Sequence, residues 1–385
     1  MGLEANTGCL KSMGDWNDFV FNGQKVAPGN RLETSLSVGK DPMGQSADIP
    51  VQILHGSKKG PTIAVTAAIH GDELNGTGII HHLVYGDDHI PGTPDDHIDP
   101  TQLSGTLILV PVVNVEGMMM GERTTPDGRD LNRLFPGSES GNQSRRLAHT
   151  LFTEVIQRSD YLIDLHTAPI TRMNVPQIRA DLDDAKCKKI ARAFGTKVIM
   201  NSKGPKGSIR HEATKAGIPT ILFESGTSHR FEPESLESGV LGILNVLAHL
   251  GMLKRDIIRP NWRIIVRKFR WVRAPVGGIL HTLIVGGSTV KEGETIAYVT
   301  DPFGARVDDV TSPVNGYVVG LATTPLVRPG DPIANIVFVR EKKIREILEK
   351  EAIEKASQTS HDEEVAEQDI DDEEGSTLDE TEFVT

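Results

Sequence analysis

The sequence is short of cysteine, of long apolar runs and of any sorting signal. Its 385 residues include only two cysteines, Cys9 and Cys187, too few for a disulfide framework or a cysteine-based metal site, so we expect a cytoplasmic protein. No apolar run reaches the roughly 18 residues that a membrane-spanning helix needs. The first residues lack the basic-then-apolar pattern of a signal peptide, so we expect neither secretion nor a membrane partner.

The net charge of −12 comes entirely from the last 25 residues, and the rest of the chain is neutral. Residues 361–385 hold 12 Asp and Glu and no Lys or Arg, and the other 360 residues hold 41 acidic and 41 basic side chains. The segment repels itself and has few apolar groups, which predicts a disordered tail over 358–385, preceded by a helix over 341–357. The neutral remainder has no basic stripe, so we expect no nucleic-acid partner.

Apolar runs alternate with helical patterns in the first two thirds of the chain. After an N-terminal lead-in segment (1–49), residues 50–255 show the pattern of an α/β catalytic domain whose strands are covered on both faces. The predicted strands are 62–69, 106–113, 161–165, 197–200 and 220–223, and the predicted helices are 74–84, 144–157, 183–194 and 234–250.

Residues 262–340 contain an internal repeat of short, glycine- and proline-rich strands. APVGG (274–278) recurs as SPVNG (312–316), and VKEG (290–293) recurs as VRPG (327–330). The repeat predicts a small all-β, barrel-like domain or sandwich with two similar halves. The region is similar to barrel domains of the biotinyl/lipoyl type, but its central turn has no lysine, so we expect no carrier role. It either narrows an active-site entrance or supports assembly into a homo-oligomer.

Polar side chains follow four of the predicted strands. HGDE, with His70 and Glu73, follows 62–69; an arginine-rich loop follows 106–113; His166 follows 161–165; and Glu224 follows 220–223. In an open α/β sheet, ligands bind at the carboxyl ends of the strands. We therefore expect these side chains to form one site.

Two histidines and one glutamate match the composition of a catalytic zinc site. His70 and Glu73 are three residues apart in a tight turn, so both can reach one ion, and His166 would be the third ligand. This set leaves a position for water, and we predict one Zn²⁺ per chain. Asp164 lies two residues before His166, where it either orients the imidazole or is a buried structural carboxylate.

Hydrolysis needs a base, a donor to the carbonyl oxygen and contacts to the substrate. Glu224 is the candidate base, and Arg123 is the candidate donor that stabilises the developing negative charge. Asn132 and Arg133 are candidates for binding a substrate carboxylate, because a guanidinium can pair with it through two hydrogen bonds. We group Asp130 with these substrate-binding residues, where it holds the loop or an arginine.

The motifs HGDE, DGRDLNRLFPG, IDLHT and FESG, in this order and spacing, resemble the succinylglutamate desuccinylase/aspartoacylase family of the zinc carboxypeptidase-like group. The resemblance covers roughly residues 35–340 and implies a zinc-dependent hydrolase with a mixed sheet flanked by helices. It implies the same roles for the residues of these motifs: His70, Glu73 and His166 as metal ligands, Glu224 as catalytic glutamate, Arg123 as carbonyl-polarising arginine, and Asn132 with Arg133 as substrate-carboxylate contacts.

One tract resembles a bacterial branch of that family. In RMNVPQIRADL (172–182), Arg172 and Arg179 are either further substrate contacts or surface charges. Arg210 is the nearest candidate for the second substrate arginine of aspartoacylase.

Together these patterns favour a deacylase that cleaves the amide bond of a small N-acylated amino acid or a related carboxylate-bearing compound. A zinc carboxypeptidase acting on a peptide or a polyglutamate-like tail is the alternative, although a β-domain over the cleft favours small substrates. A non-catalytic binding protein with this fold is disfavoured, because the expected ligands and the base are all present.

Overall fold

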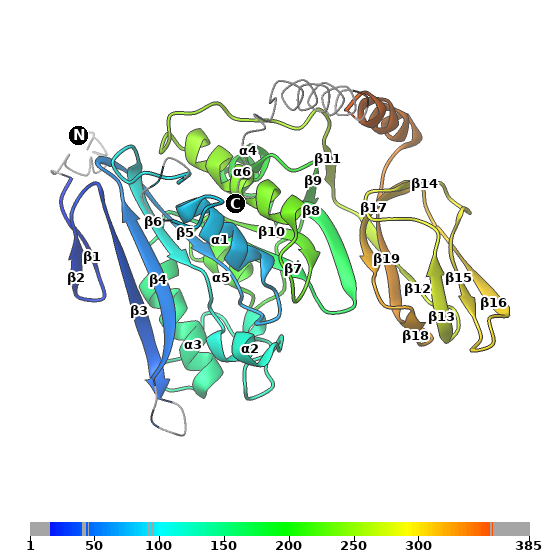
Figure 1. The fold of residues 1–385 in the computed structure, drawn as a ribbon, viewed down its shortest axis with the longest axis horizontal. Helices are drawn as coiled ribbons and strands as arrows, with labels where there is room; N and C mark the ends of the chain where they lie inside the picture. The colour runs from blue at the N-terminus through cyan, green and yellow to red at the C-terminus, as the bar shows by residue number, and fades with distance from the viewer. Residues whose placement is uncertain are drawn as a thin grey trace, which may run out of the picture.

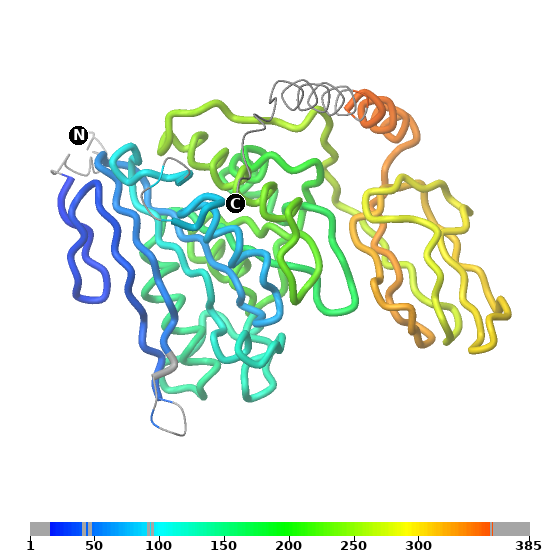
Figure 2. The backbone as a smooth tube through the Cα atoms, viewed as in Figure 1, coloured from blue at the N-terminus to red at the C-terminus, as the bar shows by residue number. Residues whose placement is uncertain are grey.

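The structure, a computed structural model, describes residues 16–40, 44, 46–90, 93, 96–354 and 356; the predicted acidic tail lies outside these residues. Figures 1 and 2 show an elongated molecule with the N-terminal strands at one end and residues 269–338 at the other. Within the described part, none of the helices combines the length and apolar character that crossing a bilayer requires.

A mixed sheet of 13 strands forms the frame of the molecule, in the order β12-β19-β17-β8-β10-β7-β5-β6-β4-β3, with β9, β11 and β14 pairing beside this path. Strands β6, β5, β7 and β10 are parallel neighbours, and β4 and β8 flank them antiparallel. The bounds are β3 (Asn30–Lys40), β4 (Ser46–His55), β5 (Lys58–Thr66), β6 (Ser104–Val110), β7 (Tyr161–Ala168), β8 (Arg172–Ala180), β9 (Val198–Asn201), β10 (Thr220–Thr227) and β11 (Ile264–Val266). The sheet therefore begins within the predicted lead-in segment. A separate hairpin, β1 (Phe19–Phe21) and β2 (Gln24–Val26), precedes it.

Helices cover both faces of the sheet, as Figure 1 shows. One core lies under α1 (Asn75–Tyr85), α4 (Ala185–Phe194) and α6 (Pro233–His249), and the other under α3 (Gln143–Leu151) and α5 (Ile209–Lys215). Alternate residues of one strand enter opposite cores: Ile63 and Val65 join the first, and Ala64 joins the second. The predicted α/β fold with a mixed sheet flanked by helices is confirmed.

The C-terminal β-domain has the pseudo-twofold organisation that its repeat predicted. One layer has the strand order β12-β19-β17-β14, and the other has the order β16-β15-β13-β18. Each strand of the first layer is related by the internal repeat to the strand at the same place in the second. Their bounds are β12 (Phe269–Arg273), β13 (Gly278–Thr282), β14 (Thr289–Val290), β15 (Thr295–Thr300), β16 (Arg306–Thr311), β17 (Gly316–Ala322), β18 (Leu326–Val327) and β19 (Pro332–Phe338). A core that includes Val299 and Ile336 lies between the layers.

Strand β8 joins the two domains and was not among the predicted strands. One edge pairs with β10; the other pairs with β17 over residues 172–174 and with β9 over residues 177–180. Pro176, which has no N–H to donate, lies between these two pairings, so it interrupts neither ladder. The sheet therefore divides at Pro176 into a branch that continues the α/β domain and a branch that belongs to the β-domain.

The helix at 341–354 packs on this junction. Ile344 and Ile347 join a buried cluster with Val198 and Trp262, and Lys197 Nζ lies 2.9 Å from Glu354 Oε2. The predicted helix before the tail is present over these residues and packs against the α/β domain beside β9.

Truncation of the chain after Ser360 is expected to leave turnover and the thermal midpoint nearly unchanged. The removed residues hold 12 acidic and no basic side chains and too few apolar ones to add to a core, so the isoelectric point should rise from about 5.6 towards neutrality. Enzyme assay, calorimetry and isoelectric focusing on the two forms check this. Loss of activity on truncation would assign the tail to the active site or to a contact between subunits.

Candidate active site

Three of the predicted side chains meet in a buried group at the strand ends. The ligand atoms of His70, Glu73 and His166 all lie within 4.8 Å of one another, and this is the group of metal-ligating side chains found within the described residues. His70 and Glu73 lie in the turn between β5 and α1, which is closed by a hydrogen bond from Glu73 N to His70 O of 3.2 Å. Gly71 allows the turn to lie against Gly117, because a Cβ at Gly71 would lie 2.1 Å from a backbone carbon there.

Each imidazole lies between Glu73 and a second carboxylate. His70 Nδ1 is 2.8 Å from Glu73 Oε1, and His70 Nε2 is 3.0 Å from Asp130 Oδ1. His166 Nδ1 is 2.7 Å from Glu73 Oε2, and His166 Nε2 is 2.8 Å from Asp164 Oδ2. If each Nε2–H donates to its aspartate, each Nδ1 keeps a lone pair on the side of Glu73, available to a metal ion. Asp164, which the sequence left open, is thus in place to orient His166, and Thr66 Oγ1 donates to its other oxygen.

The carboxylates determine the charge of this group. Burial works against a charged His166, but Asp164 and Glu73 raise its pKa well above the usual value. Burial would likewise raise the pKa of Glu73, but His70 and His166 hold it well below its usual range. Two imidazoles and three carboxylates thus lie in direct contact, and all of them except Asp130 are buried.

A test of whether these residues suit a metal ion comes from His70 Nδ1. The atom is buried and has no hydrogen-bond partner, although Glu73 Oε1 is close. A buried nitrogen without a partner is costly, and a cation bound by the group would provide that partner. Two imidazole nitrogens and a carboxylate are the donor types that zinc takes in catalytic sites. The residues present fit the predicted ion.

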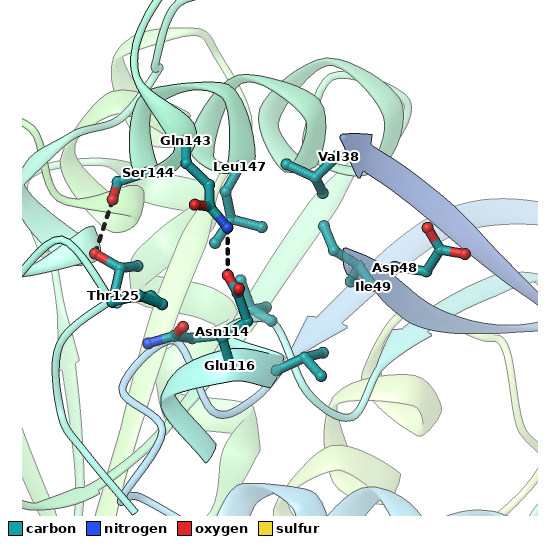
Figure 3. A pocket seen from close by; sticks show the side chains of 12 residues that line it. Val38, Asp48, Ile49, Asn114, Glu116, Thr125, Gln143, Ser144 and Leu147 are labelled. Carbon is teal, nitrogen blue, oxygen red and sulfur yellow. Dashed lines mark hydrogen bonds between the residues drawn. The ribbon is translucent and has the colours of Figure 1, made fainter. Parts of the chain in front are cut away.

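The loop between α2 (Val115–Met120) and α3 carries the arginines, and α3 anchors it from behind. Figure 3 shows this anchor beside a small cavity: Ser144 Oγ donates to Thr125 Oγ1 at 2.8 Å, and Gln143 contacts Glu116. The backbone N–H of Thr125 also donates to the Arg129 carbonyl at 3.0 Å. These contacts fix the loop at Thr125 and join the helices on either side of it, so the loop can present its side chains to the site in a fixed geometry.

Asp130 organises the inner side of this loop. It accepts hydrogen bonds from His70 Nε2 at 3.0 Å and from the backbone N–H of Asn132 at 2.9 Å, and it lies 3.6 Å from Arg123 Nη2. Burial opposes a charged Asp130, but His70 and the arginines lower its pKa far below the usual value. Its Oδ1 has two protein partners and its Oδ2 faces Arg123 and Arg133, which agrees with the expectation that Asp130 holds the loop or an arginine. A direct contact of Asp130 with the substrate stays a prediction.

Arg123 and Asn132 reach the metal-ligating group from the segment between α2 and α3, and Arg133 lies beside them. Arg123 Nη1 is 2.6 Å from Glu73 Oε1. Asn132 is buried, with Nδ2 3.5 Å from His166 Nε2, and its Oδ1 accepts the N–H of Ile209. The side chain of Arg133 is half exposed, and Nη1 donates to the Asn132 carbonyl at 2.7 Å.

Glu224 lies beside His166 at the end of the neighbouring strand. The two residues are register partners in the parallel pair β10–β7, so both side chains leave the sheet at the same edge. Glu224 is 7% exposed, and its Oε2 lies 3.2 Å from Arg179 Nη1 of β8. Arg179 therefore enters the site from the strand that the sequence did not predict.

Arg210 of α5 is the most deeply buried arginine of the site. Its Nη2 donates to Ser202 Oγ at 3.2 Å, but Nε and Nη1 are buried without a partner. Burial, followed by repulsion from Arg179, lowers the pKa of Arg210 to about 10, so it remains charged near neutral pH. An unpaired buried guanidinium of this kind is stabilised by an anionic ligand.

These side chains surround one cavity of about 230 Å³. Every predicted site residue except Asp130 lines it, together with Arg172, Arg179 and Trp271, of which the last comes from the β-domain. The lining residues are His70, Glu73, Arg123, Asn132, Arg133, His166, Pro169, Arg172, Asn174, Arg179, Pro205, Ser208, Arg210, Leu222, Glu224 and Trp271. Five arginines and two glutamates give the cavity an excess of positive charge.

The sequence pattern of the succinylglutamate desuccinylase/aspartoacylase catalytic domain matches residues 59–250, which span the metal-ligating group, the arginine loop and Glu224. The chain belongs to the succinylglutamate desuccinylase/aspartoacylase family. Residues 262–340 lie outside the matched range, so the family pattern says nothing of Trp271.

The similarity to individual relatives covers more of the chain than the catalytic domain alone. The N-alpha-acetyl-L-2,4-diaminobutyric acid deacetylase of Halomonas elongata is 27% identical over 307 residues, which cover 76% of this chain and 86% of that protein. A succinylglutamate desuccinylase/aspartoacylase structure from Rhodobacter sphaeroides matches with a TM-score of 0.70 and 26% identity over 80% of this chain and 96% of that one. The product-bound ectoine utilization protein EutE of Ruegeria pomeroyi has the same fold, with a TM-score of 0.70 and 23% identity over 80% and 95% of the two chains.

Family membership and the deacetylase relative support an enzyme that hydrolyses the amide bond of small N-acyl amino acids. Three charged or aromatic residues of the cavity were left open or missed by sequence reasoning. Arg172 and Arg179 were left open between substrate contact and surface charge, and both line the cavity. Trp271 was missed, since no sequence pattern connects the β-domain to the strand ends of the α/β domain.

Proposed function

We propose that the protein is a zinc-dependent deacylase that hydrolyses the amide bond of a small N-acylated amino acid or related compound bearing a carboxylate. One observation carries the proposal: the His70–Glu73–His166 group lines the same cavity as Glu224 and five arginines. The Halomonas elongata relative, by its name, removes an acetyl group from an N-acetylated amino acid, which supports the same reaction type.

His70, Glu73 and His166 would hold the zinc ion, which supplies a bound water with a pKa near 7. Glu224 acts as general base on the attacking water and then returns the proton to the leaving amine nitrogen. Its carboxylate is held by Arg179 at 3.2 Å, so the base keeps one orientation through the reaction. Arg123 donates a hydrogen bond to the carbonyl oxygen as negative charge develops there.

The arginines near the leaving group select the substrate. Arg133 and Arg210 bind the carboxylate of the amino acid, and Asn132 positions it through its side-chain amide. Arg210 contributes two buried N–H groups that have no protein partner. Arg133 is half exposed and contributes through a more solvated pair. Desolvated charge pairs are worth more than exposed ones, so Arg210 carries the larger part of the binding free energy.

A matched pair of substrates tests the proposed carboxylate contact. The zinc-loaded wild type is expected to hydrolyse an N-acyl amino acid, whereas the α-carboxamide of the same compound should lose most of kcat/KM, because the neutral amide leaves Arg210 unpaired. Steady-state assay of the two compounds, with elemental analysis of the same preparation, measures this. Equal rates on acid and amide would make the arginines structural and the amino-acid substrate class wrong.

The variants Arg210→Lys and Arg133→Lys extend the test to the protein side. We expect a loss of transition-state binding of about 2–4 kcal/mol for Arg210→Lys and about 1–2 kcal/mol for Arg133→Lys, because the first pair is buried and the second is partly solvated. Lysine keeps the charge but not the two-pronged hydrogen bonding. Zinc content should not change, because neither arginine is a proposed ligand. The matched control is Arg306→Lys on β16 of the β-domain, outside the cavity lining, which should leave kcat/KM near the wild-type value.

A further inference from the structure

Two side chains from other parts of the fold hold the chain around Arg123 in place. Asn114, at the end of the β6 connection, donates from Nδ2 to Thr124 O at 3.2 Å. His229, in the loop between β10 and α6, donates from Nε2 to Gly121 O at 2.9 Å. The two carbonyls lie on either side of Arg123 in the sequence. Both hydrogen bonds therefore fix the main chain from which the arginine side chain starts.

The main chains of the same two residues are bonded to the turn that carries the proposed metal ligands. Asn114 N donates to Ala68 O at 2.9 Å, and His229 N donates to Asp72 O at 2.9 Å. These two carbonyls lie on either side of His70 in the sequence. Asn114, which is buried, and His229, which is exposed, thus each connect the metal-ligating turn to the chain around the arginine.

Backbone strain occurs at the point where each connection meets the turn. His229 has a φ of 63° and Ala68 a φ of 49°, a left-handed conformation that residues other than glycine rarely adopt. Such a conformation persists only where the surrounding structure imposes it. The loop of His229 is itself anchored on α1, because Glu232 N donates to Asn75 Oδ1 at 2.8 Å. The strained residue is therefore held from the helix that directly follows the metal-ligating turn.

The ion pair of Arg123 does not fix its main chain. The side chain is 34% exposed, and its 2.6 Å contact with Glu73 Oε1 holds only the guanidinium end. A donor to a developing negative charge is effective when it is held in place before the reaction. A misplacement of about 1 Å can lower the rate by about 10²-fold. The proposed role of Arg123 thus requires a fixed distance between its main chain and the metal-ligating group.

We propose that His229 is a positioning residue that holds Arg123 at the distance from the metal-ligating group at which it can donate to the carbonyl oxygen. Asn114 has the same role on the buried side, where it also accepts a hydrogen bond from Gly117 N at 3.1 Å and so caps α2. The inference rests on the proposed function for the role of Arg123. Because His229 is exposed, its substitution tests the inference without a change in either core.

Two substitutions of His229 differ by one methylene group and separate the reach of the side chain from the backbone conformation. Asparagine tolerates the left-handed conformation but is too short to reach the Gly121 carbonyl, whereas glutamine carries an amide N–H about as far out as Nε2. With zinc-loaded protein and an N-acyl amino acid, His229→Asn should lower kcat about 10-fold with little change in KM, and His229→Gln should recover most of the loss. His249→Asn, the same change at an exposed position in the last turn of α6, should keep the wild-type kcat.

A double-mutant cycle with Arg123 distinguishes positioning from a general structural effect. Arg123→Gln should lower kcat about 10²-fold, as loss of a donor to the carbonyl oxygen does. Addition of His229→Asn to that variant should change kcat by less than about 2-fold, because no arginine is left to position. Amide hydrogen exchange gives a measurement without turnover: residues 121–124 should exchange faster in His229→Asn than in wild type or His229→Gln.

Three results would overturn the inference while the deacylase stands: an unchanged kcat in His229→Asn, an equal loss of kcat in the wild-type and Arg123→Gln backgrounds, or unchanged amide exchange over 121–124. A normal kcat in Arg123→Gln would refute both the inference and the assignment of Arg123 as donor to the carbonyl oxygen. Absence of hydrolysis by zinc-loaded wild type would refute the deacylase, and the kinetic role of His229 with it.

Discussion

Glu224→Gln is expected to lower kcat by about 10²-fold or more without loss of the metal ion. Glutamine keeps the size of the side chain and can still accept a hydrogen bond from Arg179, but it cannot take the proton of the attacking water. Glu224 is register partner of His166, so the base lies at the edge of the sheet where the proposed ligands lie. Steady-state kinetics and elemental analysis on the same preparation measure the two quantities.

Glu234→Gln is the matched control for that variant. Glu234 lies exposed in the first turn of α6, on the same segment of chain but outside the cavity lining, so its substitution should leave kcat near the wild-type value. A Glu224→Gln variant that turns over at a near-normal rate would move the proton transfer to another group. Loss of zinc from that variant would instead indicate that Glu224 supports the metal site.

Substitution of His166 by alanine is expected to abolish both metal binding and hydrolysis. Elemental analysis of wild type should find about one zinc per chain, and a chelator should remove activity that added zinc restores. His166→Ala removes one of three proposed ligands and leaves Asp164 buried without its partner. Asp164→Asn keeps the ligand but not the charge behind it, so we expect zinc affinity to fall by about 10–100-fold.

His211→Ala serves as the control for the metal experiment. His211 lies on α5, near the site in the chain but outside the metal-ligating group, so its loss should not change zinc content. Full hydrolase activity in a metal-free wild-type preparation would falsify the zinc mechanism.

The residues at the strand ends could be predicted because their signal is local. His70, Glu73, His166 and Glu224 each follow an apolar run that identifies a central strand, and the carboxyl ends of parallel strands meet at one edge of a sheet. The cores on both faces follow from the same apolar runs. These parts of the fold and of the site depend on patterns that a single segment of sequence contains.

The rest of the site depends on contacts between distant segments. Strand β8 has no apolar run, because Arg172, Asn174 and Arg179 direct polar groups to the cavity and Pro176 lies between the two pairings of one edge. Because these polar side chains face the cavity, β8 lacks the apolar run by which the other central strands could be predicted. The sequence suggested that Asp130 holds the loop or an arginine, but nothing in its own segment indicates that His70, 60 residues away, also contacts its carboxylate.

The division of the sheet at Pro176 makes the two domains inseparable by simple deletion. A chain that ended before residue 262 would leave residues 172–174 of β8 without the β17 partner, as an open sheet edge with unpaired N–H and C=O groups. Such an edge is a template for pairing between molecules, so the isolated α/β domain would tend to aggregate. It would also lose Trp271, whose ring centre lies 5.1 Å from the guanidinium carbon of Arg172. Any rearrangement of the β-domain therefore acts directly on β8, which forms part of the cavity wall.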